Sequence, residues 1–419
     1  MKKSATAERK RSRDESTTKE TANSSIDVTS SDEVLAPMTA SAARLMWLEA
    51  ASAESLNAVE TFYKSQMSVL KAKRGSGTRL TPEEIDVRNR LIMLLMQSGR
   101  SEQCVVGLTQ LGCKVRLASC VLNYTLPLPR QPSVLSSVQA PCIAADGAVP
   151  TKAFAALQAA LGPLTAAYWT AHDYSVEPPS PYFSFVLPTT PSLLAGTDES
   201  CGPLGALIAS VYQLGCRRFG DERMKKVHYA ELWGHNRPHA SGHQLHYDSD
   251  DEGRDGIRNP IVSSVLFLLG DVGGPTLVTT QRLADKQLCE HGWLCYPKEG
   301  RTLVFDGSVL HGVIPGRGVS PCVGQRRVTV MVALWETIQV RNGDGPGSAR
   351  PFPSTTPKAQ WVRDLTTYPK GVKASSPIDV TTLDVATPEE LPQVWERVDG
   401  SPVPHGDPIC RYDEVYQGF

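Results

Sequence analysis

The sequence has no surplus of charge of either sign. Its 43 lysines and arginines face 44 aspartates and glutamates, so the net charge at pH 7 is −1. A protein that binds nucleic acid through overall electrostatic attraction needs a basic surplus. Nucleic-acid enzymes also carry basic surfaces with aromatic side chains, and no such segment is visible here. We therefore do not expect nucleic acid as a partner.

Long apolar runs are missing as well. Residues 1–8 have no apolar core of the kind found in signal peptides, and no later run is long enough to span a bilayer. The ten cysteines are scattered without a Cys-x-x-Cys pair, which is typical of reduced thiols. These absences predict no membrane partner and a cytoplasmic or nuclear location. The basic run at residues 9–13 is either a nuclear signal or a solvated segment.

Composition divides the chain into four parts. Residues 1–38 are rich in Ser, Thr, Lys and Glu, which is typical of a disordered tail. Residues 39–150 are expected to form a helical N-terminal region with the first strands, and residues 151–340 the main domain. Residues 341–419 are rich in Pro, Ser and Thr and are expected to pack on that domain, anchored by Trp361 and Trp395.

Local patterns predict the secondary structure of the first half. A capping box with proline at the first helical position begins at Thr81 and predicts a helix to about Ser98. The other expectations are an Ala-rich helix over about 40–73, strands over 103–125 and 180–188, and helices over 151–172 and 203–216. The helix expected over 151–172 is interrupted at Gly162 and Pro163.

Two later segments contain the parts of a metal site. His246 and Asp248 form a His-x-Asp motif, and on a strand these alternate residues point the same way while Tyr247 points the other. His311 follows a short apolar strand at residues 302–305. Two imidazoles and one carboxylate on one face of an octahedron leave three positions open, and this site usually holds iron(II).

A final strand with arginine completes the pattern. After an apolar strand at residues 260–269 and a turn at Gly273 and Gly274, residues 326–335 read as a strand that opens with two arginines. A guanidinium grips a carboxylate with two parallel hydrogen bonds. The two arginines lie on opposite faces of the strand, so only one points inward.

At this point the chain resembles the iron(II)- and 2-oxoglutarate-dependent dioxygenases, and especially their prolyl-4-hydroxylase-like members. The resemblance covers core motifs over about 225–337. It implies an α+β fold with a double-stranded β-helix core, the jelly-roll or cupin architecture, buttressed by helices and preceded by a helical N-terminal region. It further implies a dioxygenase domain over 151–340 that hydroxylates a C–H bond of a protein side chain or small molecule, consumes 2-oxoglutarate and O2, and releases succinate and CO2.

The resemblance also implies roles for individual residues. His246, Asp248 and His311 would bind iron and so form the catalytic centre, and Arg327 would bind the far carboxylate of 2-oxoglutarate. Arg327-x-Thr329 is similar to the Arg-x-Ser pattern of the superfamily, which makes Thr329 a second contact. A lengthened loop between His311 and this strand leaves Arg326 as the alternative. By family analogy Tyr229 or Trp233 contacts the co-substrate, and ascorbate is a candidate requirement.

Several other interpretations stay open beside this one. The spacing of His235, His239, His243 and His246 would suit zinc on a helix, but nearby glycines and Pro238 argue against a helix there. The acidic run Asp250, Asp251 and Glu252 is either a solvated loop or a set of counter-charges for a cationic substrate. It does not fit a calcium loop, whose twelfth position would be Asn259 rather than glutamate.

At the level of the whole protein, the alternative is a non-catalytic, cupin-like metal-binding or interaction module. The sequence does not identify the primary substrate or the oligomeric state.

Overall fold

The computed structural model describes most of the chain after the N-terminal segment. The described residues are 38–76, 79–124, 139–175, 182–250, 257–341, 347–353, 359–372, 382–386, 388–404, 406 and 415–416. The described residues from Thr39 onward belong to one compact unit. The predicted disordered tail and the basic run at 9–13 lie outside the described residues. The predicted boundaries at 150 and 340 stay predictions.

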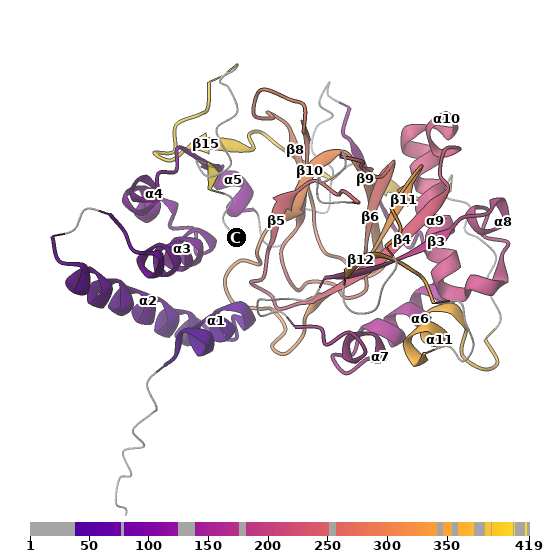
Figure 1. Ribbon diagram of the computed structural model, residues 1–419, viewed down its shortest axis with the longest axis horizontal. Helices are drawn as coiled ribbons and strands as arrows, with labels where there is room; N and C mark the ends of the chain where they lie inside the picture. Colours follow the sequence, from indigo (N-terminus) through magenta and orange to yellow (C-terminus); the bar gives the residue numbers. More distant parts are fainter. Residues whose placement is uncertain are drawn as a thin grey trace, which may run out of the picture. The chain divides into compact units, whose positions relative to one another are not determined.

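A mixed sheet of eight strands is the largest element of the fold (Figure 1). Its order is β12-β3-β4-β11-β6-β9-β2-β13, and every neighbouring pair is antiparallel except β12 with β3. The strands are β2 (Cys142–Asp146), β3 (Phe183–Pro188), β4 (Tyr229–Arg237), β6 (Val262–Phe267), β9 (Arg301–Asp306), β11 (Arg327–Trp335), β12 (Gly347–Pro351) and β13 (Val385–Ala386).

A second sheet of five strands faces the first. Its order is β14-β8-β7-β10-β5, with β5 (His243–His246), β7 (Thr276–Arg282), β8 (Gly292–Cys295), β10 (Val309–Val313) and β14 (Glu389–Leu391). From β4 to β11 the chain crosses between the sheets at every step except β7 to β8. Between the sheets lies a core of Trp233, Phe267, Trp293, Phe305 and Met331 with smaller neighbours. The side of the eight-stranded sheet that faces this core is called the inner face below.

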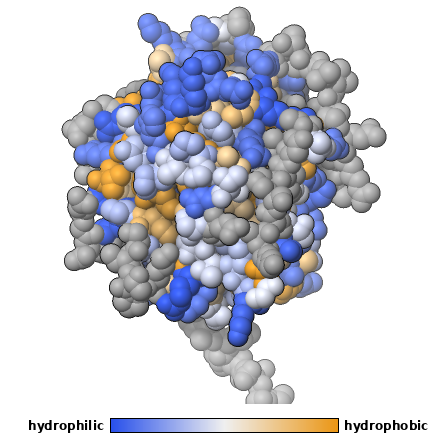
Figure 2. Space-filling view, turned by 90° about the vertical axis from the view of Figure 1, so that its right-hand side faces the viewer, coloured by the Kyte–Doolittle hydropathy of each residue, from blue (hydrophilic) through white to orange (hydrophobic). Residues whose placement is uncertain are grey.

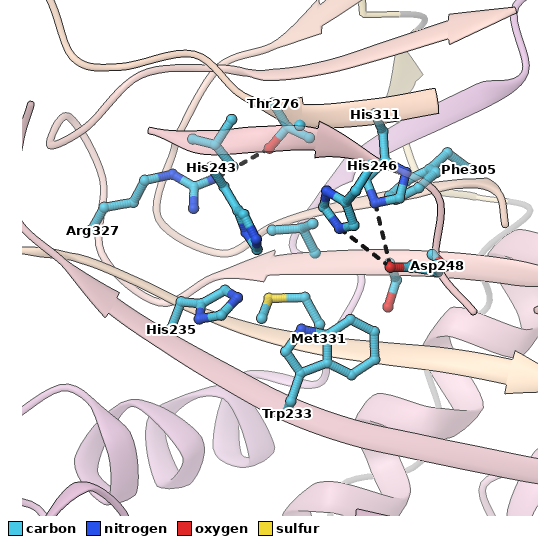
Figure 3. A pocket seen from close by; sticks show the side chains of 15 residues that line it. Trp233, His235, His243, His246, Asp248, Thr276, Phe305, His311, Arg327 and Met331 are labelled. Carbon is cyan, nitrogen blue, oxygen red and sulfur yellow. Dashed lines mark hydrogen bonds and ion pairs between the residues drawn. The ribbon is translucent and has the colours of Figure 1, made fainter. Parts of the chain in front are cut away.

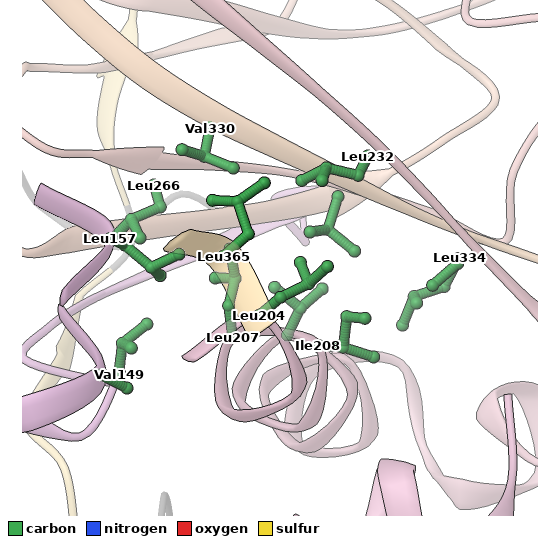
Figure 4. Close-up of a cluster of buried hydrophobic side chains, with 14 of the residues drawn as sticks. Val149, Leu157, Leu204, Leu207, Ile208, Leu232, Leu266, Val330, Leu334 and Leu365 are labelled. Carbon is green, nitrogen blue, oxygen red and sulfur yellow. The ribbon is translucent and has the colours of Figure 1, made fainter. Parts of the chain in front are cut away.

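Helices cover the outer face of the eight-stranded sheet (Figure 1). They are α6 (Thr151–Leu161), α7 (Ala167–Thr170), α8 (Pro191–Leu194), η2 (Glu199–Cys201), α9 (Gly202–Phe219), α10 (Asp221–Met224) and α11 (Gln360–Thr366). Leu204, Leu207 and Ile208 of α9 pack against Val330 and Leu334 of β11 (Figure 4). All five are essentially buried, and each such side chain stabilises the fold by roughly 1.5–3 kcal/mol relative to exposure.

The N-terminal helices are α1 (Ala40–Glu49), α2 (Ala53–Arg74), α3 (Pro82–Gln97), η1 (Ser101–Cys104), α4 (Val105–Gln110) and α5 (Ser119–Leu122). Helices α3, η1, α4 and α5 pack on the five-stranded sheet through a third apolar cluster, which contains Met96, Leu108, Leu245, Leu277 and Leu294 among others. Helix α2 packs on α3, and α1 packs on α2. A small sheet, β15-β1-β16, completes this layer with β1 (Val115–Leu117), β15 (Trp395–Arg397) and β16 (Val415–Tyr416).

Two predictions for this region are wrong. The expected helix over 40–73 is two helices, because Ala50 adopts a left-handed conformation with φ 47° and Ser52 starts a new capping box with Ser55. The expected strands over 103–125 are mostly helical, with only β1 extended. The helix predicted from Thr81 is confirmed as α3, with its capping box to Glu84. The predicted interruption of the 151–172 helix is confirmed between α6 and α7.

The helix-covered side of the molecule presents mainly hydrophilic and intermediate residues, with hydrophobic residues in smaller groups (Figure 2). Among the described residues, no helix is both long enough and apolar enough to cross a membrane.

Candidate metal centre and its pocket

Two neighbouring strands of the five-stranded sheet bring His246 and His311 together. They are directly opposite each other in the register of β5 and β10, and their ring centroids are 4.4 Å apart. Asp248 lies two residues beyond the end of β5. Its Oδ1 is 3.4 Å from His246 Nε2 and 3.6 Å from His311 Nε2. One ligand atom from each residue lies within 4.8 Å of the other two, so the three donors converge on one point.

Hydrogen bonds on the far side of each ligand fix its orientation. The Nδ1 atoms of His246 and His311 lie 2.8 Å from Gln244 O and 3.0 Å from Val309 O. A carbonyl only accepts, so Nδ1 carries the proton and Nε2 presents its lone pair toward Asp248. Ser263 Oγ donates to Asp248 Oδ2 at 2.6 Å and leaves Oδ1 directed at the histidines. This donor set fits a divalent metal with open positions.

The surroundings keep Asp248 ionised. Burial alone would raise the pKa of this carboxyl, but the facing imidazoles of His311 and His246, when they are protonated, lower it well below its ordinary value. Asp248 is ionised and lies beside two imidazoles that can be neutral. It can therefore bind a cation without first losing a proton.

Arg327 is the other notable group. It is 2% exposed, one guanidinium nitrogen donates to Thr276 Oγ1 at 3.0 Å, and the guanidinium lies 5.0 Å from the Phe267 ring centroid. Its Nε has no hydrogen-bond partner among the described residues, and no described carboxylate forms an ion pair with it. Burial, with a smaller contribution from Arg237, lowers its pKa to about 10. A buried cation without a counter-charge is costly, so this site suits an anionic ligand.

Arg326 has the opposite surroundings. Its guanidinium donates to Glu49 Oε1 of α1 at 2.6 Å, away from the core between the sheets. The alternation along β11 therefore turns Arg327, and not Arg326, to the inner face.

A single pocket contains the three metal-ligand candidates and Arg327 (Figure 3). Figure 3 shows Arg327 and Asp248 at opposite ends of it. Between them the wall consists mainly of side chains from both sheets, namely Trp233, His235, His243, Val265, Thr276, Phe305 and Met331.

The remaining histidines do not join the metal group. Within the described part of the chain, only His246, Asp248 and His311 bring three potential metal-ligand atoms close together. His239 accepts a hydrogen bond from Gly273 N at 3.0 Å and its Nε2 lies 3.1 Å from Arg317 O, so it links two loops. His243 stacks on His246 with centroids 4.6 Å apart, and His235 contacts His243 at 5.1 Å. Burial holds the pKa of both well below the ordinary value.

Two further residues predicted to bind the co-substrate lie outside the pocket lining. Thr329 is on the inner face beside Arg327, fully buried, and its hydroxyl has no hydrogen-bond partner among the described residues. Tyr229 begins β4 at some distance along the strand, and Trp233 of the same face lines the pocket instead.

The structure corrects both interpretations of the acidic run for one of its residues, Asp250. Asp250 is 3% exposed, and its Oδ2 accepts hydrogen bonds from Arg258 Nε and Gln339 N, both at 2.8 Å. It is therefore neither a solvated loop residue nor a free counter-charge. Asp251 and Glu252 lie outside the described residues.

Sequence reasoning missed Ser263 and Thr276, which orient the site, whereas His243 was interpreted as a loop residue or a neighbour of the metal ligands and does stack on His246. Alternation gave a usable signal for Ser263, because it shares the inner face of its strand with Val265 and Phe267. Nothing in the sequence indicated that Thr276 would meet Arg327, since that contact depends on how two sheets face each other.

Comparison with known proteins gives distant structural similarity only. No protein-family model matches the chain, and no curated protein matches it. The solved structures that resemble it include a Pseudomonas putida prolyl-4-hydroxylase, with 16% identity, TM-score 0.29, and coverage of 46% of this chain and 92% of that one.

Two others are an oxidoreductase of the 2OG-Fe(II) oxygenase family from Burkholderia pseudomallei and EctD from S. alaskensis with 2-oxoglutarate and 5-hydroxyectoine. The first has 15% identity, TM-score 0.21, and coverage of 34% of this chain and 55% of that one. The second has 14% identity, TM-score 0.27, and coverage of 53% and 83%.

Proposed function

We propose that this chain is an iron(II)- and 2-oxoglutarate-dependent dioxygenase, and that it hydroxylates a C–H bond while releasing succinate and CO2. The observation that carries the proposal is one pocket whose two ends call for ligands of opposite charge, a metal cation at one end and an anion at the other. At one end His246, Asp248 and His311 direct three donor atoms at a common point, and at the other Arg327 is buried and forms no ion pair with a carboxylate of the described residues. A metal chelated by one end of a dicarboxylate whose far end pairs with Arg327 would satisfy both requirements.

The strand order supports the same proposal. Strands β4, β11, β6 and β9 are adjacent in one sheet, and β8, β7, β10 and β5 are adjacent in the other. Two facing antiparallel sheets of four strands, with the chain crossing from one sheet to the other at most steps, are typical of a jelly roll. We propose that β4 to β11 form a double-stranded β-helix, with the candidate ligands at β5 and β10.

Each pocket residue has a task in this proposal. His246, Asp248 and His311 would hold iron(II), with Ser263 and two backbone carbonyls keeping them oriented. When bound, iron and 2-oxoglutarate together supply the oxidising power of the reaction. Arg327 would pair with the far carboxylate, and Thr276 holds its guanidinium in place. The Thr329 hydroxyl, which has no hydrogen-bond partner among the described residues, is a further donor on that face. Because Asp248 would occupy the third protein-ligand position on the metal, that position is not open to a halide, which favours hydroxylation over halogenation.

The alternative is a metal-binding module without catalysis. It predicts the same metal site but gives Arg327 no task, and a buried guanidinium without a counter-charge costs stability. For this reason we favour the enzyme. The primary substrate, a protein side chain or a small molecule, is taken up below.

Succinate formation tests the proposal without a known substrate. Purified protein with iron(II), ascorbate and 2-oxoglutarate is expected to produce succinate slowly, and Asp248→Ala is expected to abolish this. Omitting ascorbate in a parallel sample tests whether it is required. Glu60→Gln, a substitution among the N-terminal helices, is the matched control. No succinate, together with no binding of iron or 2-oxoglutarate, would move us to the alternative.

We further propose an intracellular location, cytoplasmic or nuclear. The support is that no disulfide joins the cysteines of the described part of the chain, as expected in a reducing compartment.

A further inference from the structure

A carboxyl group is buried on the inner face without a cation to neutralise it. Glu231 lies in the middle of β4 and is 6% exposed. No lysine, arginine or histidine of the described residues forms an ion pair with it. Buried carboxyls are normally paired or hydrogen-bonded to several donors. Burial, opposed by the hydrogen bond from Ser184 and reinforced by Asp248, raises the pKa of Glu231 to about 7.

The strand register places Glu231 at the level of the candidate metal centre. In the paired strands Glu231 is opposite Ala333, and Ala333 is opposite Ser263. Ser263 donates to the metal-ligand candidate Asp248. Strands are about 4.8 Å apart, so Glu231 and Ser263 stand about 10 Å apart on the same face. The residue between them is Ala333, whose side chain is only a methyl group, and Trp233 and Ser263 of the same face line the pocket that holds the metal-ligand candidates.

Aromatic side chains surround this carboxyl. Tyr229 and Trp233 are the residues two before and two after it, so all three side chains share the inner face. Trp335 is paired with Tyr229 in the register of β11 and β4. The Trp335 indole nitrogen is buried and has no hydrogen bond of standard geometry among the described residues, although it lies close enough to Glu231 to lower the pKa of that group. A carboxylate among aromatic rings is the environment that recognises ammonium groups.

Glu231 is also held in place. Ser184 of β3 donates its hydroxyl hydrogen to Glu231 Oε1, and the same hydroxyl accepts from Ala349 N at 2.6 Å. This leaves the carboxyl fixed in position with one oxygen not engaged by Ser184. Arg327 and Arg237, which are paired across β11 and β4, are six residues further along β4, or about 20 Å away. The interior is therefore basic at one end and acidic at the other.

We propose that Glu231, with Tyr229, Trp233 and Trp335, is the subsite that binds a cationic amine of the primary substrate and so presents a neighbouring C–H bond to the metal centre. This inference rests on the proposed function and gives its substrate class: an ammonium-bearing small molecule or a basic side chain of a protein. Glu231 is a positioning residue in this scheme, since it does not touch the metal.

A pair of isosteric probes tests the proposal on the unaltered protein. Choline and 3,3-dimethylbutan-1-ol have nearly the same shape and differ in the cationic nitrogen. Protein loaded with iron(II) and 2-oxoglutarate under anaerobic conditions is titrated with each, and broadening of the methyl proton resonances by the paramagnetic iron reports binding near the metal. We expect choline to bind about tenfold or more tightly than its neutral isostere.

Glu231→Gln then assigns the preference to this residue. The amide oxygen can still accept the Ser184 hydrogen bond, so the fold is expected to survive, and the melting temperature checks this. The preference for choline should disappear in Glu231→Gln and persist in Glu60→Gln, which removes a buried carboxylate of the N-terminal helices. A short blocked peptide with one lysine, titrated in the same way, separates the two sources: tighter binding of the peptide indicates a protein substrate, and tighter binding of choline a small molecule.

Other outcomes overturn the inference. Equal binding of the two isosteres, no binding of choline or of the peptide, or a choline preference that survives in Glu231→Gln would each exclude this subsite. These results are distinct from failure of the proposed function, in which the protein would bind neither iron(II) nor 2-oxoglutarate.

Discussion

Arg326 and Arg327 are adjacent in the chain and differ completely in surroundings. Arg326 pairs with Glu49 near the surface, whereas Arg327 is buried against Phe267 and donates a hydrogen bond to Thr276. Desolvating a guanidinium without a carboxylate opposes folding. Such a group is best explained by a ligand that supplies the missing charge.

Substituting Arg327 should therefore affect the co-substrate directly. We expect Arg327→Met to weaken 2-oxoglutarate binding by about a hundredfold, because a charge-assisted hydrogen bond in a buried site is lost. Isothermal titration calorimetry of the metal-loaded protein measures it. Arg326→Met is the control and should leave the affinity unchanged, and the reverse pattern would mean that the wrong arginine has been assigned.

Glu231 gives stability a characteristic dependence on pH. Its pKa is about 7 in the fold against an ordinary value of 4.5, so the folded state holds the proton more tightly. The free energy of unfolding therefore falls as pH rises from about 4.5 to about 7, by about 3 kcal/mol, and is constant above. Glu231→Gln should lack this loss, and urea titrations of both metal-free proteins from pH 4 to pH 8 measure the difference.

Asp248 contributes to the pH dependence of stability with the opposite sign, and it does so in both the wild type and Glu231→Gln. Its lowered pKa adds stability at neutral pH that is lost as pH falls. A stability difference between wild type and Glu231→Gln that stays constant with pH would contradict the assigned pKa of Glu231.

The sequence predicted that His246, Asp248 and His311 would lie together, as they do, because a strand alternates its side chains and the motif supplies two of the three donors, while metal binding by them stays a prediction. The same alternation selected Arg327. It did not reveal that Asp250 is buried, because Arg258 and Gln339 reach it from segments 8 and 89 residues away. Nor did it single out Glu231, whose neighbours on β3 and β11 come from distant parts of the chain.

The turn before β7 fixes the position of Thr276, which contacts Arg327 at one end of the pocket. Gly273 has φ +84° and its N–H is bound by His239, while a Cβ on Gly274 would lie 1.9 Å from Ile314 O. This close approach holds the start of β7, and therefore Thr276, against the end of β10. Only glycine permits it.

We expect Gly274→Ala to separate these strands. The clash is with backbone atoms, which cannot move aside as a flexible side chain would, so the substitution should destabilise the fold by about 2 kcal/mol or more. Thermal unfolding measures the loss. Gly318→Ala, at a glycine with nothing within 4 Å of the added Cβ, is the control for a generic effect and is strained only by its positive φ. A melting temperature for Gly274→Ala above that of Gly318→Ala would contradict this account.

Elements of the main domain were easier to predict than those of the N-terminal layer. Strands β6, β7 and β9 are rich in apolar and β-branched residues and are flanked by glycine or proline, which distinguishes them from helices. Residues 103–125 contain short apolar groups that suit either structure. They are helical because η1, α4 and α5 pack Cys104, Leu108 and Val121 into the cluster on the outside of the five-stranded sheet, a contact that local pattern cannot specify.

At the scale of the whole molecule, ligand binding should raise stability. A metal and a dicarboxylate that bind only the folded state add the binding free energy at the concentrations used. We expect iron(II) with excess 2-oxoglutarate to raise the melting temperature by a few degrees relative to protein treated with chelator. Differential scanning fluorimetry checks this under anaerobic conditions. Asp248→Ala should show no such rise, and an equal rise in that variant would indicate binding elsewhere.

The strands after β11 have a consequence for how the protein is made. β12 and β13 form the two outer strands of the eight-stranded sheet, and β14 forms one outer strand of the five-stranded sheet. Unpaired outer strands are templates for association with other chains. During synthesis, β3, β2 and β8 therefore have open edges until residues 347–391 have left the ribosome. A nascent chain of this protein is therefore exposed to aggregation after its candidate metal ligands have been made, and that interval is when a chaperone would be most useful to it.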